Sequence, residues 1–285
     1  MGISSFHVHS RFCDGSGEPE EYILKALEAG FCAIGFSSHA PLPFENDWTM
    51  KKTEVQTYCQ EIRRLQTKYR ECISVYLGLE IDYLPGLSGP RSEQFNALNL
   101  DYVIGSIHVA DFVPEGPYLS VDGSEAEYLQ LLEQVYHGDI QAMVTDYFHR
   151  VREMVIIHHP DIVGHLDIIK KNNPQERYFS EKEAWYIEAV QATLELIARS
   201  GVIVEVNTGG IARNYVDDLY PSSWILAECR RLNIPIMLNS DAHHPEALSA
   251  YYDQALDRLA CLGFEKQRIL INHIWTEDEL GKDIR

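Results

Sequence analysis

The segment Ile3-Ser-Ser-Phe-His-Val-His9 begins the chain with a short apolar run that ends in two histidines. Similar runs recur along the sequence. Several are rich in valine and isoleucine and are bounded by glycine, asparagine or proline, which favours buried β-strands. We expect strands at Ile3–Phe6, Cys32–Phe36, Ser74–Leu79, Tyr102–Ile107, Asp161–Gly164, Val202–Val206 and Pro235–Leu238.

Segments with helical spacing of apolar residues lie between these runs. One of them, Pro19–Ala29, places Tyr22, Ile23 and Ala26 on one face. Ser180 and Glu183 have the spacing of a capping box at the start of another. The remaining helices are expected at Glu54–Tyr69, Glu125–Tyr136, Ile140–Ile157, Glu181–Ser200, Ser222–Leu232 and Pro245–Leu262.

The alternation of strands and helices indicates an α/β fold with a parallel sheet and helices outside it. Seven strand–helix units predict a (β/α)7 TIM-like barrel, with a doubly wound open sheet as the alternative. No linker or low-complexity segment divides the chain, so we expect residues 1–285 to form a single domain.

The composition indicates which kinds of binding partner are expected. Hydrophobic residues make up 45% of the 285 residues, which is enough for a sizeable core, and the formal net charge is −19. A strongly acidic surface repels phosphate backbones and anionic membranes, so neither nucleic acid nor a membrane is expected as a partner. The six cysteines include no C-x-x-C pair, and neither a signal peptide nor an apolar run of about 20 residues is found. These features predict a cytoplasmic protein with reduced thiols.

Titratable residues follow nearly every predicted strand. In a parallel barrel the carboxyl ends of the strands form one face, and active sites form there. Chance placement would not follow the strand ends in this way. The residues are His7 and His9 after the first strand, His39 after the second, Glu80 after the third, His108 after the fourth, His165 after the fifth, Asn207 after the sixth, and Asp241 and His243 after the seventh.

This set of side chains points to metal binding. The His7-x-His9 spacing puts two imidazoles on one side of a strand end. Imidazoles combined with carboxylates suit zinc, manganese or iron. The number of potential ligands exceeds what one four- to six-coordinate ion needs, which indicates two or three ions with a bridging carboxylate such as Glu80.

Single members of the set have other readings. A lone histidine at a strand end is more often a hydrogen-bonded structural residue than a ligand. Asp14, in Cys13-Asp-Gly15, is either a ligand from the first loop or a turn residue, and Cys13 is either a soft ligand or a buried loop thiol. We expect purely structural roles for the remaining histidines, which are His137, His149, His158, His159, His244 and His273.

Six short motifs occur in the order found in the PHP (polymerase and histidinol phosphatase) superfamily, and the sequence resembles that superfamily over positions 7–243. The motifs are His7-Val-His9-Ser, Gly35-Phe-Ser-Ser-His39, Gly78-Leu-Glu80, Gly105-Ser-Ile-His108, Gly164-His165 and Ser240-Asp-Ala-His243. Within it, the chain most resembles the histidinol-phosphate phosphatases. That resemblance rests on Ser38-His-Ala-Pro-Leu-Pro-Phe44, Val151-Arg-Glu-Met154, Gly164-His-Leu-Asp-Ile-Ile-Lys-Lys171, Asn207-Thr-Gly-Gly-Ile-Ala-Arg213 and Ile234-Pro-Ile-Met-Leu-Asn-Ser-Asp-Ala-His243.

The resemblance implies a distorted (β/α)7 barrel and three divalent transition-metal ions, of zinc, manganese or iron. By the family pattern, His7, His9, Glu80 and Asp241 hold the first ion, Glu80, His108 and His165 the second, and Asp14, His39 and His243 the third. Relatives often have a histidine where this chain offers Asp14.

The resemblance also implies hydrolysis of a small phosphate monoester, L-histidinol phosphate, by a hydroxide that bridges the metals, as a step of histidine biosynthesis. Asp241 or His243 is expected to assist proton transfer. Arg213 is the candidate phosphate clamp, because a guanidinium pairs bidentately with phosphate oxygens. Further candidates for contacting the substrate are His39, Arg177, Lys170, Asp111, Glu115 and Trp48.

Two other functions compete with this interpretation. One is another phosphoesterase of the same architecture, acting on a sugar phosphate or phosphotyrosine, or a nuclease, which the acidic surface disfavours. The other is a metal-stabilised scaffold without catalysis. A degenerate scaffold is expected to lack ligands, whereas this chain retains the full set.

Overall fold

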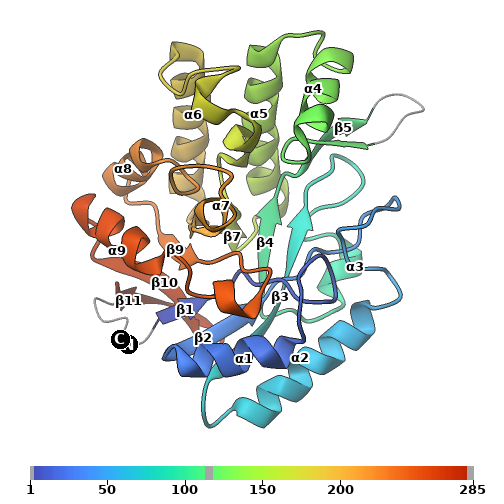
Figure 1. The fold of residues 1–285 in the computed structure, drawn as a ribbon, viewed down its shortest axis with the longest axis vertical. Coiled ribbons are helices and arrows are strands. Elements are labelled where there is room, and N and C mark those ends of the chain that lie inside the picture. The colour runs from blue at the N-terminus through green and yellow to red at the C-terminus, as the bar shows by residue number, and fades with distance from the viewer. Residues whose placement is uncertain (1–2, 113–117, 281–285) are drawn as a thin grey trace.

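The computed structural model describes residues 3–112 and 118–280, with the side chains of residues 110–112 left out. Seven parallel strands form one sheet in the order β1-β2-β3-β4-β7-β8-β9 (Figure 1). Their bounds are β1 Ile3–Ser5, β2 Phe31–Phe36, β3 Ser74–Asp82, β4 Tyr102–Ser106, β7 Ile162–Val163, β8 Ile203–Asn207 and β9 Ile236–Asn239.

The first and last strands of this sheet meet just beyond their carboxyl ends. Val8 and Ala242 form a parallel bridge, in which the His9 N–H donates to the Ala242 carbonyl at 2.9 Å. This contact closes the sheet into a nearly complete barrel. The (β/α)7 TIM-like fold predicted from the sequence is therefore confirmed, and the open doubly wound sheet is wrong.

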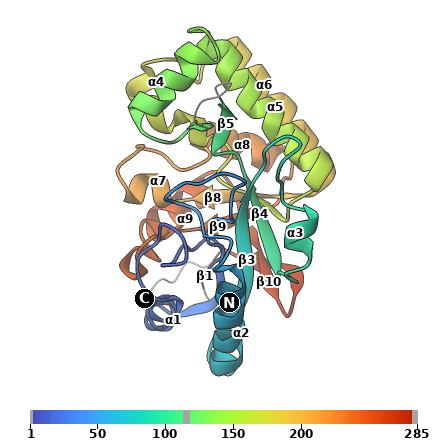
Figure 2. The ribbon, with the colours of Figure 1, turned by 90° about the vertical axis from the view of Figure 1, so that its right-hand side faces the viewer.

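Figure 1 shows the helices arranged around the outside of the strands, and α5 and α6 lie side by side there and in Figure 2. The α-helices are α1 Pro19–Glu28, α2 Val55–Tyr69, α3 Glu93–Asn96, α4 Glu125–Gln134, α5 Ile140–His158, α6 Ala184–Ser200, α7 Gly209–Ala212, α8 Ser223–Arg231 and α9 Tyr252–Cys261. Three 3-10 helices accompany them, η1 Ile168–Asn172, η2 Pro174–Glu176 and η3 Pro245–Ala247. None of the helices in the described ranges is both long and apolar enough to cross a membrane.

The start of α1 illustrates how local sequence sets a helix. Pro19 occupies the first turn, where its missing N–H costs nothing. The side chain of Glu21 accepts from the Glu18 backbone N–H at 2.6 Å and so completes a capping box. Tyr22, Ile23 and Ala26 form the buried face that the spacing predicts.

Two predicted helices differ from their expected bounds by more than one residue at the start. The α6 helix starts at Ala184 rather than Glu181, and only half of the predicted capping box forms, because the Ser180 N–H donates to Glu183 while the Ser180 hydroxyl accepts from Lys182. The predicted helix at residues 245–262 is divided into η3 and α9, because Tyr251 adopts a left-handed conformation with φ 62°.

Two antiparallel hairpins were not expected from the sequence. One consists of β5 Val109–Phe112 and β6 Tyr118–Ser120, and α4 packs against it. The other consists of β10 Lys266–Ile271 and β11 Ile274–Glu279. Both follow elements of the barrel and leave the order of its strands unchanged.

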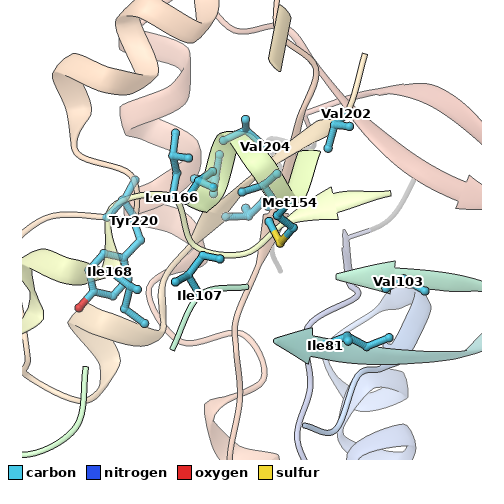
Figure 3. Packing of buried hydrophobic residues seen from close by; sticks show 14 of the residues in the cluster. Ile81, Val103, Ile107, Met154, Leu166, Ile168, Val202, Val204 and Tyr220 are labelled. Atoms are coloured by element: carbon cyan, nitrogen blue, oxygen red, sulfur yellow. The ribbon is translucent and has the colours of Figure 1, made fainter. Parts of the chain in front are cut away.

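The main hydrophobic core lies between the strands and the surrounding helices. Figure 3 shows part of it, with Ile81 on β3, Val103 on β4 and Val204 on β8. Met154 of α5 belongs to the same cluster and is fully buried. This outer core fixes the helices against the barrel and leaves the ends of the strands free for other contacts.

A second, smaller core fills the barrel interior toward the amino ends of the strands. Tyr102 reaches across the interior, and its hydroxyl donates to the Phe6 carbonyl at 2.6 Å. Gly78 makes room for this ring, because a Cβ at position 78 would lie 2.4 Å from the Tyr102 Cζ. Ile269 and Leu270 of β10 pack against the same cluster, so the β10–β11 hairpin closes this end of the barrel.

Candidate metal and phosphate site

The carboxyl ends of the strands surround a pocket of about 300 Å³. Its lining combines acids, imidazoles, two cationic side chains and three aromatic rings. The lining residues are Asp14, His39, Trp48, Glu80, His108, Asp122, Gly123, His165, Ile168, Lys171, Arg213, Tyr215, Tyr220, Asp241 and His243.

Glu80 lies at the centre of this end of the barrel and is fully buried. Its Oε2 lies 3.1 Å from the Nε2 of His7, 3.4 Å from the Nε2 of His9 and 3.0 Å from the Nδ1 of His39. Three imidazoles from the first two strand ends therefore converge on one carboxylate oxygen. This arrangement fits a shared ligand between neighbouring ions.

The other oxygen of Glu80 faces the fourth and fifth strand ends. Oε1 lies 2.8 Å from the Nε2 of His165 and 3.5 Å from the Nε2 of His108, and it accepts from the Ser106 hydroxyl at 2.6 Å. The two imidazole nitrogens are themselves 3.2 Å apart. Two imidazole nitrogens at this separation, beside a carboxylate, form a second group suited to a cation.

Asp241 follows β9 and completes the first group. Its Oδ1 lies 3.1 Å from the Nε2 of His9 and 3.6 Å from the Nε2 of His7, while Oδ2 accepts from Arg213 Nη2 at 2.7 Å. Asp241 and His165 both have left-handed backbones, with φ 50° and φ 26°. Non-glycine residues held there carry local strain, and such strain clusters at functional sites.

Asp14 comes from the first loop and faces a third group of imidazoles. Its Oδ2 lies 3.3 Å from the Nε2 of His243, and its Oδ1 lies 3.8 Å from both the Nδ1 of His9 and the Nε2 of His39. This position supports the ligand interpretation of Asp14 over that of a turn residue. Cys13 contacts the Nδ1 of His9 at 3.4 Å, and burial raises the pKa of its thiol to about 12.

The electrostatics of the cluster favour ionised carboxylates. Burial alone would raise the pKa of Glu80, but His7 and His39 outweigh it and hold that pKa well below its usual range. The pKa of Asp241 is lowered in the same way, because Arg213 and His7 outweigh burial. Burial, His243 and His39 together lower the pKa of His9 to about 3, so this imidazole is neutral, as a metal ligand must be.

The residues present fit divalent cations. Among the described residues there are four overlapping groups of three or four potential ligands. Within each group the ligand atoms lie within 4.8 Å of one another, and together the groups include all nine predicted ligands. The buried Nε2 of His9 and Nδ1 of His39 make no hydrogen bond of good geometry, although carboxylate oxygens lie within 3.1 Å of both. Nitrogen and oxygen donors in such a set suit zinc, manganese or iron.

Two buried acids behind the cluster were not predicted. Asp82 Oδ1 lies 3.1 Å from the Nδ1 of His108, and Glu205 Oε1 lies 2.6 Å from the Nδ1 of His7. Carboxylates in this position orient metal-binding imidazoles and fix their tautomers. A signal was available in the sequence, because Glu205 interrupts the apolar run of β8 and Asp82 follows Glu80 by two residues.

Arg213 lies beside the cluster and faces the pocket. Its Nη1 donates to the Asp241 carbonyl at 2.8 Å and lies 2.9 Å from the Nδ1 of His243. Lys171, which was not predicted, lines the same pocket, interacts with Asp122 and lies 4.4 Å from the centre of the Tyr215 ring. The pocket therefore combines the cluster of potential ligands with two cationic side chains.

Two of the predicted substrate contacts are placed elsewhere. Arg177 is 60% exposed and pairs with Glu125 at 2.6 Å, outside the pocket lining. Lys170 is buried and donates to Asp167 at 2.8 Å and to Ser222, which leaves its ammonium group no access to the pocket. Both lie in the loop after β7, but their side chains turn toward partners that the sequence order did not reveal.

The other predicted contacts have different outcomes. Trp48 and His39 both line the pocket, with ring centroids 4.8 Å apart. The side chain of Asp111 and the whole of Glu115 lie outside the described residues. The six histidines predicted to be structural do not line the pocket; His158, for example, packs 5.5 Å from the ring of Tyr83.

Residues 5–209 match the PHP domain family, which covers most of the chain, so the chain belongs to that family. A "Probable histidinol-phosphatase" of Deinococcus radiodurans is 28% identical over 265 residues, which span 92% of this chain and 94% of that protein. The "Histidinol-phosphatase" of Bacillus subtilis is 28% identical over 268 residues, which span 88% of this chain and 97% of that protein.

A solved structure has a similar fold. The histidinol phosphate phosphatase from Lactococcus lactis subsp. lactis, complexed with zinc, L-histidinol and phosphate, superposes with a TM-score of 0.70 at 23% identity. The superposition covers 96% of this chain and 98% of that one. At this level of identity the likeness concerns the fold, and it agrees with the barrel described above.

Proposed function

We propose that this protein is a metal-dependent phosphatase that hydrolyses L-histidinol phosphate to L-histidinol and phosphate. The observation that carries the proposal is the convergence of six imidazoles on Glu80, Asp241 and Asp14 at the carboxyl end of the barrel, with Arg213 beside them. Similarity over nearly the full length to proteins named histidinol-phosphatase supports the choice of substrate.

We assign the ligands to three divalent ions of zinc, manganese or iron. From the pairwise distances, the first set is His7, His9, Glu80 and Asp241, the second is Glu80, His108 and His165, and the third is Asp14, His39 and His243. When bound, such ions polarise phosphoryl oxygens and lower the pKa of water toward neutrality. The chain itself supplies the ligand positions, a cation for the phosphate and groups that carry protons.

Arg213 is the proposed phosphate clamp. Its guanidinium is held by Asp241 at 2.7 Å and remains 29% exposed toward the pocket, so part of its donor fork is available to an anion. A planar guanidinium presents paired donors that match two phosphate oxygens. Lys171 adds a second positive charge to the same pocket.

Hydrolysis breaks the bond between phosphorus and the ester oxygen, and the departing alkoxide requires a proton. Asp241 and His243 are the candidates. The side chain of His243 is 20% exposed, whereas that of Asp241 is 6% exposed and already holds Arg213. His243 therefore has the better access to a leaving group, as a proton donor in the state in which its Nε2 does not bind the third ion. Asp241 is better suited to holding Arg213 and its neighbouring imidazoles.

The pocket also suits the rest of this substrate. L-histidinol phosphate carries an ammonium group and an imidazole, which favour acidic and aromatic neighbours. Asp122 and Trp48 line the pocket and supply one of each. The net charge of −19 further favours a small phosphate ester over a nucleic acid.

Phosphate release from L-histidinol phosphate tests this function directly. We expect turnover with kcat/KM well above that for sugar phosphates, phosphotyrosine and an aryl phosphate. A chelator should abolish the activity, and added zinc or manganese should restore it. A higher kcat/KM for another ester would change the assigned substrate. If the metal-replete protein were inactive on every ester, the alternative of a non-catalytic, metal-stabilised scaffold would be favoured.

A further inference from the structure

Glu205 is a buried acid on β8 that has no place in the proposed reaction. It is fully buried and does not line the pocket. Four donors surround its carboxylate. Oε1 contacts the His7 Nδ1 at 2.6 Å and the Asn239 amide at 2.9 Å, and Oε2 accepts from the His165 N–H at 2.9 Å and the Asn207 amide at 3.0 Å.

The contact with His7 determines which of its nitrogens faces the cluster. A carboxylate oxygen at 2.6 Å from Nδ1 requires that Nδ1 carry the proton. In the neutral imidazole, which is the form that binds metal, the lone pair then lies on Nε2, which points toward Glu80 at 3.1 Å and Asp241 at 3.6 Å. Glu205 thus selects the tautomer that presents His7 as a ligand.

The contact with His165 holds a strained backbone. His165 follows the two-residue strand β7 and has a left-handed φ of 26°. This conformation is unfavourable for a residue with a Cβ and persists only when its surroundings enforce it. The hydrogen bond from the His165 N–H to Glu205 is one such constraint, and it aims the imidazole at Glu80 Oε1, 2.8 Å away.

The two asparagines extend the network to neighbouring strands. Asn239 accepts from the Phe6 N–H at 2.7 Å, next to His7, and Asn207 donates to Asp241 Oδ2 at 3.3 Å. A single carboxylate therefore connects the ends of β1, β7, β8 and β9. In contrast, the contacts of Asp14 and His243 described above do not involve Glu205.

We propose that Glu205 is a positioning residue that sets the His7 tautomer and the His165 backbone, and so determines the affinity of the cluster for the ions held by these two histidines. The inference rests on the metal binding in the proposed function. It predicts selectivity, because the ion assigned to Asp14, His39 and His243 should not depend on Glu205.

Glu205→Gln is the sharpest variant, because it keeps the shape and changes one acceptor into a donor. If the amide nitrogen faces His7, it favours the wrong tautomer. If it faces His165, it meets two N–H donors. We expect zinc affinity to fall about 10–100-fold for the ions bound by His7 and His165, with the remaining ion retained.

Two quantities are measured for each variant: the zinc content per chain, and the zinc affinity by competition with a chromophoric chelator. The melting temperature in excess chelator reports the stability of the metal-free protein. Asp167→Asn is the matched control, since Asp167 is also fully buried and bonded to Lys170 and Ser222. It should lower the melting temperature and leave zinc affinity unchanged. Asp14→Asn should weaken a different ion from the one or two lost in Glu205→Gln.

Glu205→Asp is a second variant. Its shorter side chain keeps the negative charge but holds the carboxylate farther from His7, so it should also weaken zinc binding. Wild-type zinc affinity in both Glu205 variants would overturn the proposal. So would equal losses in Asp167→Asn, or failure of both Glu205 variants to fold without metal, since either result indicates a structural role only. A wild-type protein that binds zinc but hydrolyses no ester would refute the proposed function and leave this test decisive.

Discussion

The two ends of the barrel are built from the same strands but differ in chemistry. At the amino end, apolar residues of the other six strands and Phe6, which follows β1, form an interior cluster that the β10–β11 hairpin covers. At the carboxyl end, the residues that follow the strands are imidazoles and carboxylates, and five histidines lie around Glu80. Tyr102 and Glu80, for example, lie on neighbouring strands, and their side chains occupy opposite ends of the barrel interior.

This contrast separates stability from function within one fold. Burying apolar side chains stabilises the barrel from its amino end. The carboxyl end instead gathers buried charges and holds His165 and Asp241 in left-handed conformations, both of which cost stability. Such a cluster is expected to persist because the rest of the barrel enforces it, so substitutions at the two ends should have separable effects.

The largest effect is expected at the centre of the polar end. Glu80→Gln removes the charge shared by five imidazoles. Loss of a residue that only hydrogen-bonds a metal ligand reduces activity about 10–100-fold, so loss of a ligand itself should reduce turnover of L-histidinol phosphate by more than about 100-fold. Metal content should fall with it. Phosphate release and metal analysis on the same preparation test this, and a fully active variant would contradict the bridging role of Glu80.

Met237→Ala probes the apolar end. Met237 is fully buried in the amino-end cluster, so its truncation should lower the free energy of unfolding by about 2–5 kcal/mol. Metal content and kcat at low temperature should match those of the wild type. Denaturant titration measures the first quantity, and loss of metal from the folded variant would show that the two ends are coupled.

Arg213→Ala should affect substrate handling while leaving the ions bound. Removing one preorganised donor to a developing charge costs on the order of 100-fold in kcat. We expect a loss of that size in kcat/KM for the phosphate ester, with metal content preserved because a guanidinium is positively charged and offers no lone pair to a metal ion. Unchanged kinetic parameters would rule out the phosphate clamp.

The polar end should also make the stability of the metal-free protein depend on pH. The pKa of His9 is about 3, below its ordinary 6.5, so its contribution to stability is present above about pH 6.5 and is lost as the pH falls toward 3. For His108, burial alone would lower the pKa, but Asp82 and Glu80 outweigh burial and raise it to about 10.

The contribution of His108 is therefore present below about pH 6.5 and is lost as the pH rises toward 10. Together the two histidines predict maximal stability of the metal-free protein near pH 6.5. Denaturant titrations across pH in excess chelator measure this. The destabilisation by Met237→Ala should be the same at every pH. If the free energy of unfolding of the metal-free wild type did not change with pH, this would argue against the pKa shifts of His9 and His108.

The smallest effect is expected from Arg177→Ala. Arg177 forms an exposed ion pair with Glu125, and such pairs contribute about 0–1 kcal/mol. Both KM and kcat should stay at wild-type values, which makes this variant the matched control for Arg213→Ala. A clear rise in KM would return Arg177 to the substrate site.

Local pattern was sufficient for most of the fold. Hydrophobic periodicity predicted the seven barrel strands and most helices, because the positions that face the core repeat along each element. It failed for the β10–β11 hairpin, since pairing between two short strands at the end of the chain depends on the apolar cluster they cover. It also missed the break at Tyr251, which depends on a single left-handed residue.

The candidate ligands could be predicted for a similar reason. Parallel strands bring their carboxyl ends to one face, so residues such as His7, Glu80 and His165 meet whatever the details of packing. The direction in which a side chain points could not be predicted in this way. Lys170 and Lys171 are adjacent in sequence, yet one is buried against Asp167 and the other lines the pocket.

The sequence by itself determined the order of strands and helices, the candidate ligands and the edge of the sheet at which they gather, because all three follow from periodicity and position along the chain. Only the tertiary structure decided that Asp14 faces His243, that Arg177 turns away and that Glu205 lies behind His7. These outcomes depend on distances between side chains from separate elements, and such distances are set by packing in three dimensions.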